Sequence, residues 1–212
     1  MGGEDKTMTN DEYFEQGKQK LDVAIAAVNK IVDSMGPKTK PALKTMFGGP
    51  FGEQFFTAPA STRRAYHNAY PGGLVAHSLN VVRNAVKLGE TMFPNRWTTE
   101  QLMFCALLHD VGKAGDGVEP FYVRSTGSYK WERGEFYELN RETQYMPSSE
   151  MGLYVLQRYG VTLTQEEYLA LRLSDGPAAE NNTMYKFREP DLAVLIHTAD
   201  EWAMRDEKAD AR

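Results

Sequence analysis

Histidine and cysteine are the scarcest reactive residues of this sequence, with four histidines and one cysteine among 212 residues. A single cysteine cannot build a disulfide framework, and it excludes a zinc site made of several thiolates. Cys105 lies within an apolar helical pattern, so we expect a buried free thiol. Such a thiol suits the reducing cytoplasm, where we expect the protein to reside.

Long apolar runs are also missing, and the longest fall well short of the roughly 20 residues that span a bilayer. Residues 1–6 are polar and acidic, unlike a secretory signal peptide, and Lys6 breaks the myristoylation pattern. We therefore expect no membrane partner. With 42% hydrophobic residues, the chain can bury one good core, and we interpret residues 1–212 as a single domain.

The net charge of −5 conceals an uneven distribution. Residues 37–87 contain seven Lys or Arg and one acid, Glu53, which gives this segment +6 and leaves −11 for the remainder. A locally positive surface would attract an anionic substrate, although solvated lysines on a helix face would give the same count. The overall acidity argues against double-stranded nucleic acid as a partner.

Capping signals and apolar periodicity predict a mostly helical chain. Thr9 and Glu12 begin a helix over about residues 10–35, which Gly36-Pro37 ends. Residues 47–64 are expected to form an ordered loop or short helices packed on the core. Further helices are expected at about 73–89, 99–110, 148–159, 165–173 and from 190 onward.

One segment departs from the helical periodicity. Residues 121–125 and 128–131 alternate in character around Thr126-Gly127, which predicts a β-hairpin inserted between helices. The expected fold class is therefore all-α, a helical bundle with a small β-hairpin insertion.

Two histidines and two aspartates suggest the chemistry. His77 and Asp200 each lie on an apolar helical segment, and His109-Asp110 closes another. Burying imidazoles and carboxylates is costly unless something pairs with them, and a divalent cation would pair with all four. We therefore predict one ion (Mn, Mg, Co, Ni, Fe or Zn) held by His77, His109, Asp110 and Asp200. The alternative is that both histidines are hydrogen-bonded core residues.

The adjacent pair sets a geometric condition. Neighbouring helical residues point about a hundred degrees apart, so His109 and Asp110 share one ion only where the backbone turns. Gly112 follows at once and permits such a turn. A bound cation would lower the pKa of a water molecule until that water becomes a nucleophile near neutral pH.

The order of these residues resembles the HD superfamily of metal-dependent phosphohydrolases. Residues 109–113, His-Asp-Val-Gly-Lys, are similar to its His-Asp-x-Gly-Lys signature. Residues 66–79 are similar to the segment before the first ligand in firmicute HD-domain 3′–5′ exoribonucleases. The chain as a whole most resembles small single-domain HD hydrolases of bacteria and their phages. The resemblance implies an HD core over about residues 60–205, with the helix over about 10–35 packed on it.

Two departures limit what the resemblance implies. HD enzymes with two or three metals carry extra histidines before the final aspartate, whereas none lies between His109 and His197 here. A single-metal site is therefore implied, although Glu150 or Asp175 would allow a second, weaker ion. The nucleic-acid-binding domain of the exoribonucleases is also lacking, which argues against processive RNA degradation.

Two residues beside the ligands are candidates for catalysis, together with the ligand Asp110. Lys113 would neutralise charge on phosphoryl oxygens, unless it is a solvated helix-end lysine. His67 lies in a basic, aromatic loop, and an unperturbed histidine titrates near neutrality and can protonate a leaving oxygen. The Tyr-His-Asn triplet around it looks like the one that holds the general acid in cyclic-nucleotide phosphodiesterases, but it lies farther from the first ligand. A structural role for His67 fits equally well.

Other candidates concern substrate binding. Arg63 and Arg64 would clamp phosphate oxygens, and Asp116 would bind a water or a ribose, although a solvated loop aspartate is the simpler interpretation. We expect His197 to support the site or the core rather than to bind the ion. Aromatic residues of the hairpin are expected to pack within it, with stacking on a base as the alternative: Tyr129, Trp131 and Tyr137.

The sequence thus predicts an enzyme that hydrolyses a phosphoester or phosphoanhydride bond of a nucleotide with one metal ion. Two alternatives stay open: an HD phosphodiesterase or nuclease acting on short oligonucleotides or cyclic nucleotides, and a non-catalytic domain that binds a nucleotide or a protein partner. The expected partner is a phosphorylated small molecule, and assembly into a homo-oligomer is left open.

Overall fold

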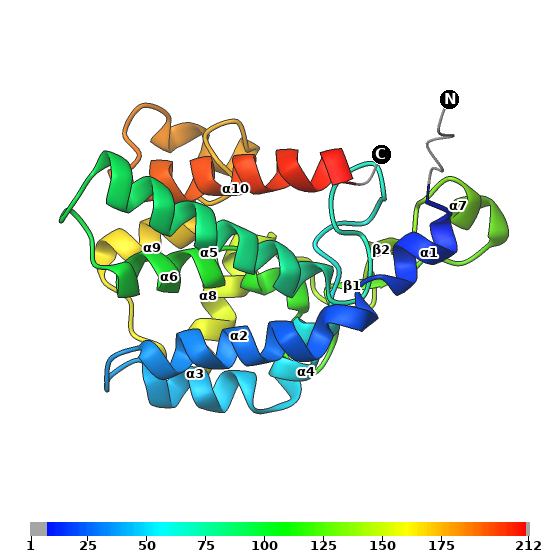
Figure 1. The fold of residues 1–212 in the computed structure, drawn as a ribbon, viewed down its shortest axis with the longest axis horizontal. Helices are drawn as coiled ribbons and strands as arrows, with labels where there is room; N and C mark the ends of the chain where they lie inside the picture. Colours follow the sequence, from blue (N-terminus) through cyan, green and yellow to red (C-terminus); the bar gives the residue numbers. More distant parts are fainter. Residues whose placement is uncertain (1–7, 211–212) are drawn as a thin grey trace, which may run out of the picture.

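The computed structural model describes residues 8–210, in which helices dominate (Figure 1). The longer helices are α2 (Leu21–Ser34), α5 (Gly73–Met92), α6 (Thr99–Leu108), α8 (Ser148–Arg158) and α10 (Asp191–Asp210). The shorter helices are α1 (Asn10–Glu15), α3 (Lys40–Phe47), α4 (Pro50–Thr57), α7 (Ser128–Glu132) and α9 (Gln165–Arg172). Short 3₁₀ segments are η1 (Lys18–Lys20), η2 (Val111–Ala114) and η3 (Glu180–Tyr185). The predicted all-α class is confirmed.

The centre of the molecule is α5, which packs against α10 on one side and α6 on the other (Figure 1). Side chains from all three helices are fully buried where they meet: Leu74, Val81, Leu102, Leu107, Leu192 and Ile196. Burying a large aliphatic side chain contributes about 1.5–3 kcal/mol, so this contact holds the three helices in fixed positions. These are the helices that carry or adjoin the four predicted ligands.

The N-terminal helix is interrupted, contrary to the single helix predicted over residues 10–35. Its capping box is present, because Thr9 accepts from Glu12 N and the Glu12 carboxylate accepts from Thr9 N. The break falls at Gly17, where a Cβ atom would clash with the backbone oxygen of Pro71. The chain must therefore leave α1 here to pass close to the loop before α5.

The small sheet differs from the predicted hairpin. Strand β1 (Tyr122–Arg124) lies where it was predicted, but it pairs with β2 (Tyr137–Leu139) in an antiparallel register. The predicted second strand over residues 128–131 is wrong, because these residues form α7. Helical geometry brings Trp131 against Phe14 and lets its indole N–H donate to Asp11.

An aromatic cluster joins α1 to this sheet. It consists of Tyr13, Phe14, Trp131, Phe136 and Tyr137, together with the buried Ala69. It is separate from the main core, to which α3 and α4 contribute the fully buried Leu43, Met46, Phe51 and Phe55. Of these two helices, α4 lies in the segment 47–64 where short helices were an alternative, whereas α3 was not predicted. Among residues 8–210, no helix is both long and apolar enough to cross a membrane.

Candidate metal centre

The four predicted ligands come from three places along the helical core. His77 lies on α5 and Asp200 on α10, while His109 ends α6 and Asp110 follows it. At Asp110 the backbone leaves the helical conformation, with φ −112° and ψ 13°. The turn that a shared ion requires is therefore present.

Gly112 is needed for a different reason from the one predicted. A Cβ atom at this position would clash with the backbone oxygen of Ser148, at the start of α8. The close approach of α8 to η2, rather than conformational freedom, requires glycine here. This packing holds the turn that presents His109 and Asp110.

The imidazoles and carboxylates converge. His77 Nε2 lies 2.9 Å from Asp200 Oδ1 and 3.7 Å from Asp110 Oδ2. His109 Nε2 lies 3.4 Å from Asp110 Oδ2 and 3.8 Å from Asp200 Oδ1. The structure brings all four predicted residues into one buried group, which we call the His-Asp cluster.

Several polar atoms of the cluster lack a hydrogen-bond partner among the described residues. They are His77 Nε2, His109 Nε2 and Asp200 Oδ1. His77 Nε2 and Asp200 Oδ1 face each other at 2.9 Å as an ion pair, and neither atom has a further partner among the described residues. A buried, unsatisfied polar atom costs about 1–3 kcal/mol. A divalent cation would satisfy all three atoms, so the residues present fit such an ion.

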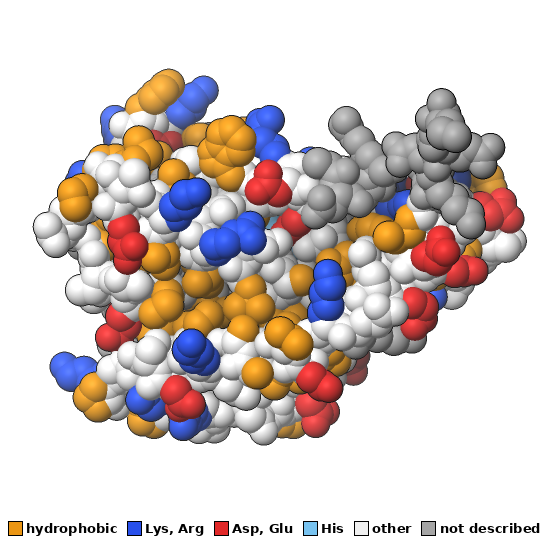
Figure 2. Space-filling model, viewed as in Figure 1, with side chains coloured by type: hydrophobic (Ala, Val, Ile, Leu, Met, Phe, Trp, Pro, Cys, Tyr) orange, Lys and Arg blue, Asp and Glu red, His pale blue; other side chains and the backbone are white. Residues whose placement is uncertain are grey.

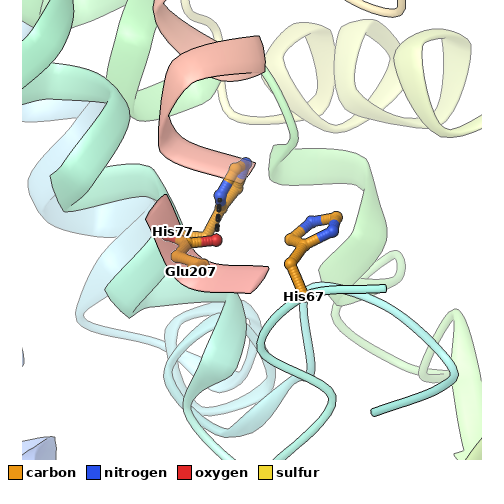
Figure 3. A group of neighbouring side chains, drawn as sticks. All are labelled: His67, His77 and Glu207. Atoms are coloured by element: carbon orange, nitrogen blue, oxygen red, sulfur yellow. Dashed lines mark hydrogen bonds and ion pairs between the residues drawn. The ribbon is translucent and has the colours of Figure 1, made fainter. Parts of the chain in front are cut away.

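The other nitrogen of each imidazole is engaged. His77 Nδ1 lies 3.0 Å from a carboxylate oxygen of Glu207 (Figure 3). His109 Nδ1 lies 2.8 Å from the carbonyl oxygen of Ala106. Both partners are acceptors, so each Nδ1 carries a proton and each Nε2 is the atom that would bind a metal. Without an ion, burial would lower the pKa of His77, but Asp200 and Glu207 outweigh burial and raise that pKa to about 10, so a metal at its Nε2 would displace a proton. Glu207 is not among the predicted residues, although it lies seven residues after Asp200 on the same face of α10.

A second group of potential ligand atoms also lies near His77. His67, His77 and Glu207 have ligand atoms within 4.8 Å of one another, as do His77, His109 and Asp110. Glu207 already accepts from the Nδ1 side of His77. We therefore place the candidate ion on the Nε2 side, among the residues of the His-Asp cluster.

Neighbouring charged groups shift the pKa values of the two aspartates and of Lys113 toward their ionised forms. Burial would raise the pKa of Asp110, but Lys113 and His109 hold it well below its usual range. Burial would likewise raise the pKa of Asp200, but His77 and His109 lower it. Lys113 Nζ lies 2.6 Å from Asp110 Oδ2, and this contact raises the pKa of Lys113 in spite of its burial. Both aspartates are therefore ionised near neutral pH, the form that binds a cation.

The cluster opens toward solvent on one side. The side chain of His77 is fully buried, whereas those of Asp200 and Lys113 are 13% and 16% exposed. Tyr122 and Asp175 lie near enough for the charges of Lys113 and Asp110 to influence the pKa of each. Burial and then the charge of Asp110 raise the pKa of Asp175, but its exposed side chain places it at the rim rather than inside.

His67 lies beside the cluster, with its ring centroid 4.8 Å from that of His77 (Figure 3). The expectation that it titrates near neutrality is wrong. Burial, followed by the positive charges of His77 and Lys113, lowers the pKa of His67 to about 2. Its Nε2 is buried without a hydrogen-bond partner among the described residues. His67 is therefore a neutral imidazole that can donate or accept one more hydrogen bond.

The predicted phosphate-binding arginines make contacts elsewhere. Arg64 donates to Asn10 Oδ1 at 2.8 Å, and its guanidinium lies over the ring of Tyr13. Arg63 lies 3.5 Å from a carboxylate oxygen of Glu135. The structure therefore does not bring either arginine to the cluster, because both fasten the loop before α5 to its neighbours.

Asp116 and Glu150 are also engaged away from the cluster. Asp116 Oδ1 accepts from the backbone N–H groups of Val118 and Glu119, so it stabilises its own loop. Glu150 lies 3.3 Å from Arg172 and lines a surface pocket of about 640 Å³ between α8 and α9. Of the two carboxylates predicted to recruit a second ion, only Asp175 lies near the cluster.

His197 contacts the loop next to the His-Asp cluster, as expected, and is not one of the residues that converge there. Its Nδ1 lies 3.2 Å from the carbonyl oxygen of Ser174, whose hydroxyl donates to the carbonyl oxygen of His109. His197 also packs so closely over Gly176 that a Cβ atom there would clash with its ring. These contacts fix the loop beneath the end of α6.

Comparisons with known proteins give no relative for this chain: no family model matches the sequence, and no curated protein or solved structure matches it.

Proposed function

We propose that the His-Asp cluster binds one divalent cation and that the protein is a metal-dependent phosphohydrolase of the HD type, acting on a nucleotide. One observation carries the proposal: the orphaned atoms His77 Nε2, His109 Nε2 and Asp200 Oδ1 converge in a buried group with the ionised Asp110. Structural packing alone gives no reason to bury these atoms without partners.

A cation bound in this group would polarise a phosphoryl oxygen and lower the pKa of a water molecule. The substrate phosphate would enter at the exposed edge, where Lys113 lies between Asp110 and solvent. Lys113 Nζ is charged and would donate to the phosphate oxygens as negative charge grows on them. The hydroxyl of Tyr122, near the charge of Lys113, would bind the phosphate or the sugar.

His67 would serve this site as a neutral hydrogen-bonding group. With a pKa of about 2, it holds no second proton to deliver to a leaving oxygen. A positive ion nearby would lower that pKa further, because like charges repel. We propose that His67 orients the attacking water or the phosphate.

The choice of a nucleotide rests on the resemblance of residues 66–79 and 109–113 to HD enzymes and on the basic segment 37–87. A reducing compartment such as the cytoplasm suits the buried free thiol of Cys105.

The test is a hydrolysis panel run on protein stripped with a chelator and reloaded with Mn, Mg, Co, Ni, Fe or Zn. The substrates are nucleoside mono-, di- and triphosphates, cyclic nucleotides and short oligonucleotides. We expect metal-dependent release of phosphate from one nucleotide class. Cleavage of only the cyclic nucleotides or oligonucleotides would make it a phosphodiesterase. Tight metal binding without any hydrolysis would sink the enzymatic proposal and favour a binding domain.

A further inference from the structure

We infer that Glu207 is a positioning residue of the cation site, whose carboxylate holds the Nδ1 proton of His77 and so directs Nε2 toward the ion. The inference rests on the proposed function, because it assigns Glu207 a role in binding the proposed cation. Glu207 lies beyond the segment that the HD resemblance covers.

Both carboxylate oxygens of Glu207 are used on α5. Oε2 lies 3.0 Å from His77 Nδ1, and Oε1 accepts from Asn80 Nδ2 at 2.7 Å. His77 and Asn80 lie one turn apart on the same helix, so the carboxylate spans two fixed donors. A ring held in this way cannot rotate away from the cluster.

Burial makes a purely structural role costly. The side chain of Glu207 is 5% exposed, and a charged carboxylate in such surroundings is destabilising unless it is compensated. Its partners, an amide and an imidazole, compensate it fully only when the imidazole carries positive charge or binds a cation. A carboxylate behind a metal-binding histidine fixes the ring and increases its basicity as a ligand.

Two carboxylates of α10 face the two ring nitrogens of His77. Asp200 faces its Nε2, and Glu207, two turns farther along the same face, faces its Nδ1. The two histidines of the cluster therefore differ, because His109 has only the neutral carbonyl oxygen of Ala106 behind it. Of these two histidines, only His77 has a carboxylate facing its Nδ1.

The surroundings of Glu207 allow the residue to be changed without overpacking. Glu207, Asn80, Tyr13 and Asn68 line a pocket of about 400 Å³, which lies between α2 and α5. Hydrophobic side chains gather in a hollow between these two helices (Figure 2). A side chain of similar size at position 207 would thus keep the local packing.

The experiment compares cation affinity in the full chain with Glu207→Gln and Glu207→Leu. Gln keeps an oxygen that accepts from His77 Nδ1 but loses the charge, while Leu loses both. We expect Co²⁺ and Zn²⁺, measured by competition with a chelator, to bind about 10–100 times more weakly to Glu207→Gln. Glu207→Leu should bind them more weakly still. The matched control is Asp206→Asn, which removes the same charge from the exposed neighbour and should bind as the wild type does.

A spectroscopic measurement separates positioning from packing. In the Zn²⁺-loaded wild type, the proton on His77 Nδ1 should appear as a slowly exchanging, downfield NMR signal, because a buried carboxylate accepts it. This signal should move upfield in Glu207→Gln and vanish or exchange rapidly in Glu207→Leu. Circular dichroism and thermal melting of the metal-free variants check that each remains folded.

The outcomes are separable. Wild-type affinity in a folded Glu207→Gln and a folded Glu207→Leu would overturn the inference and leave the proposed function intact. Equal losses in both variants, with the NMR signal unchanged in Glu207→Gln, would show that the residue only packs. If the wild type binds none of these cations, the proposed function fails and the inference fails with it.

Discussion

The His-Asp cluster and the aromatic cluster both place charged side chains against buried groups, but they differ in how those groups are satisfied. In the aromatic cluster, the Arg124 guanidinium lies 4.1 Å from the centre of the Phe14 ring and also faces Trp131. In the His-Asp cluster, the Nε2 atoms of His77 and His109 have no such partner among the described residues. The first region is satisfied within the chain, whereas the second could hold a metal ion from outside it.

This difference separates functional from structural candidates. Basic and aromatic residues near the loop before α5 suggested substrate binding, yet Arg64 is saturated by Asn10 and Tyr13. Histidines on apolar helices suggested either a metal site or a core, and their unsatisfied atoms favour the metal site. Hydrogen-bond satisfaction, which sequence cannot reveal, therefore distinguishes the two regions.

Removing one ligand should have the largest effect on the comparison. We expect His109→Ala to lose its cation and to reduce hydrolysis to the uncatalysed background, because one of the four ligands is gone and an imidazole is a strong donor to these divalent metals. Elemental analysis of the purified variant measures the metal, and circular dichroism checks the fold. Full metal occupancy in a folded His109→Ala would refute the assignment of the site.

Lys113→Ala should leave the cation in place and still slow the reaction by about two to three orders of magnitude. Lys113 contacts Asp110 from the open edge and is placed to donate to the phosphate rather than to the ion. Turnover measured beside metal content tests this. Near-normal turnover with a full complement of metal would show that Lys113 only forms a structural ion pair with Asp110.

His67→Ala should lower the rate about tenfold, the worth of one hydrogen bond of roughly 1–1.5 kcal/mol. The loss should be equal for a nucleotide and for a nitrophenyl phosphate, whose leaving group needs no proton. Because the pKa of His67 is about 2, it is neutral throughout the range from pH 5 to 8. The pH–rate profiles of wild type and variant should thus run parallel there. A much larger loss on the nucleotide, with a missing limb near pH 6.5, would instead identify a general acid.

Arg64→Ala should have the smallest effect on chemistry, with unchanged turnover and metal content. It should lower the free energy of unfolding by about 1–2 kcal/mol, through the lost bond to Asn10 and the lost stacking on Tyr13. Urea titration measures this change. A large increase in KM without loss of stability would restore the predicted phosphate-binding role and break the contrast between the two regions.

The parts of the fold that depend on local sequence were predictable. The capping boxes at Thr9 and Thr164 mark the true starts of α1 and α9. The break at Gly17 was not predictable, because its cause is the approach of Pro71 from the distant loop before α5. The displaced second strand has a similar cause, since Trp131 folds onto α1 rather than continuing a hairpin.

In the candidate site too, residues that are neighbours in sequence were predictable, whereas one that depends on distant packing was not. His109, Asp110 and Lys113 are neighbours in sequence, and their motif reveals them. Glu207 was overlooked although its spacing from Asp200 was visible, because a lone acid near a charged helix end resembles a solvated residue. Its burial arises only when α10 packs along α5.

The position of His77 against α10 also has a consequence for the stability of the folded chain. His77 on α5 and Asp200 on α10 lie 123 residues apart in the sequence (200 − 77), so a cation bound by both would close a long loop as a reversible cross-link. An ion that binds only the folded chain adds about 2.7 kcal/mol of stability when its concentration is a hundred times the Kd. Chelation should therefore lower the melting temperature and loosen α10 first. The amount of folded protein would then follow the free metal concentration around it.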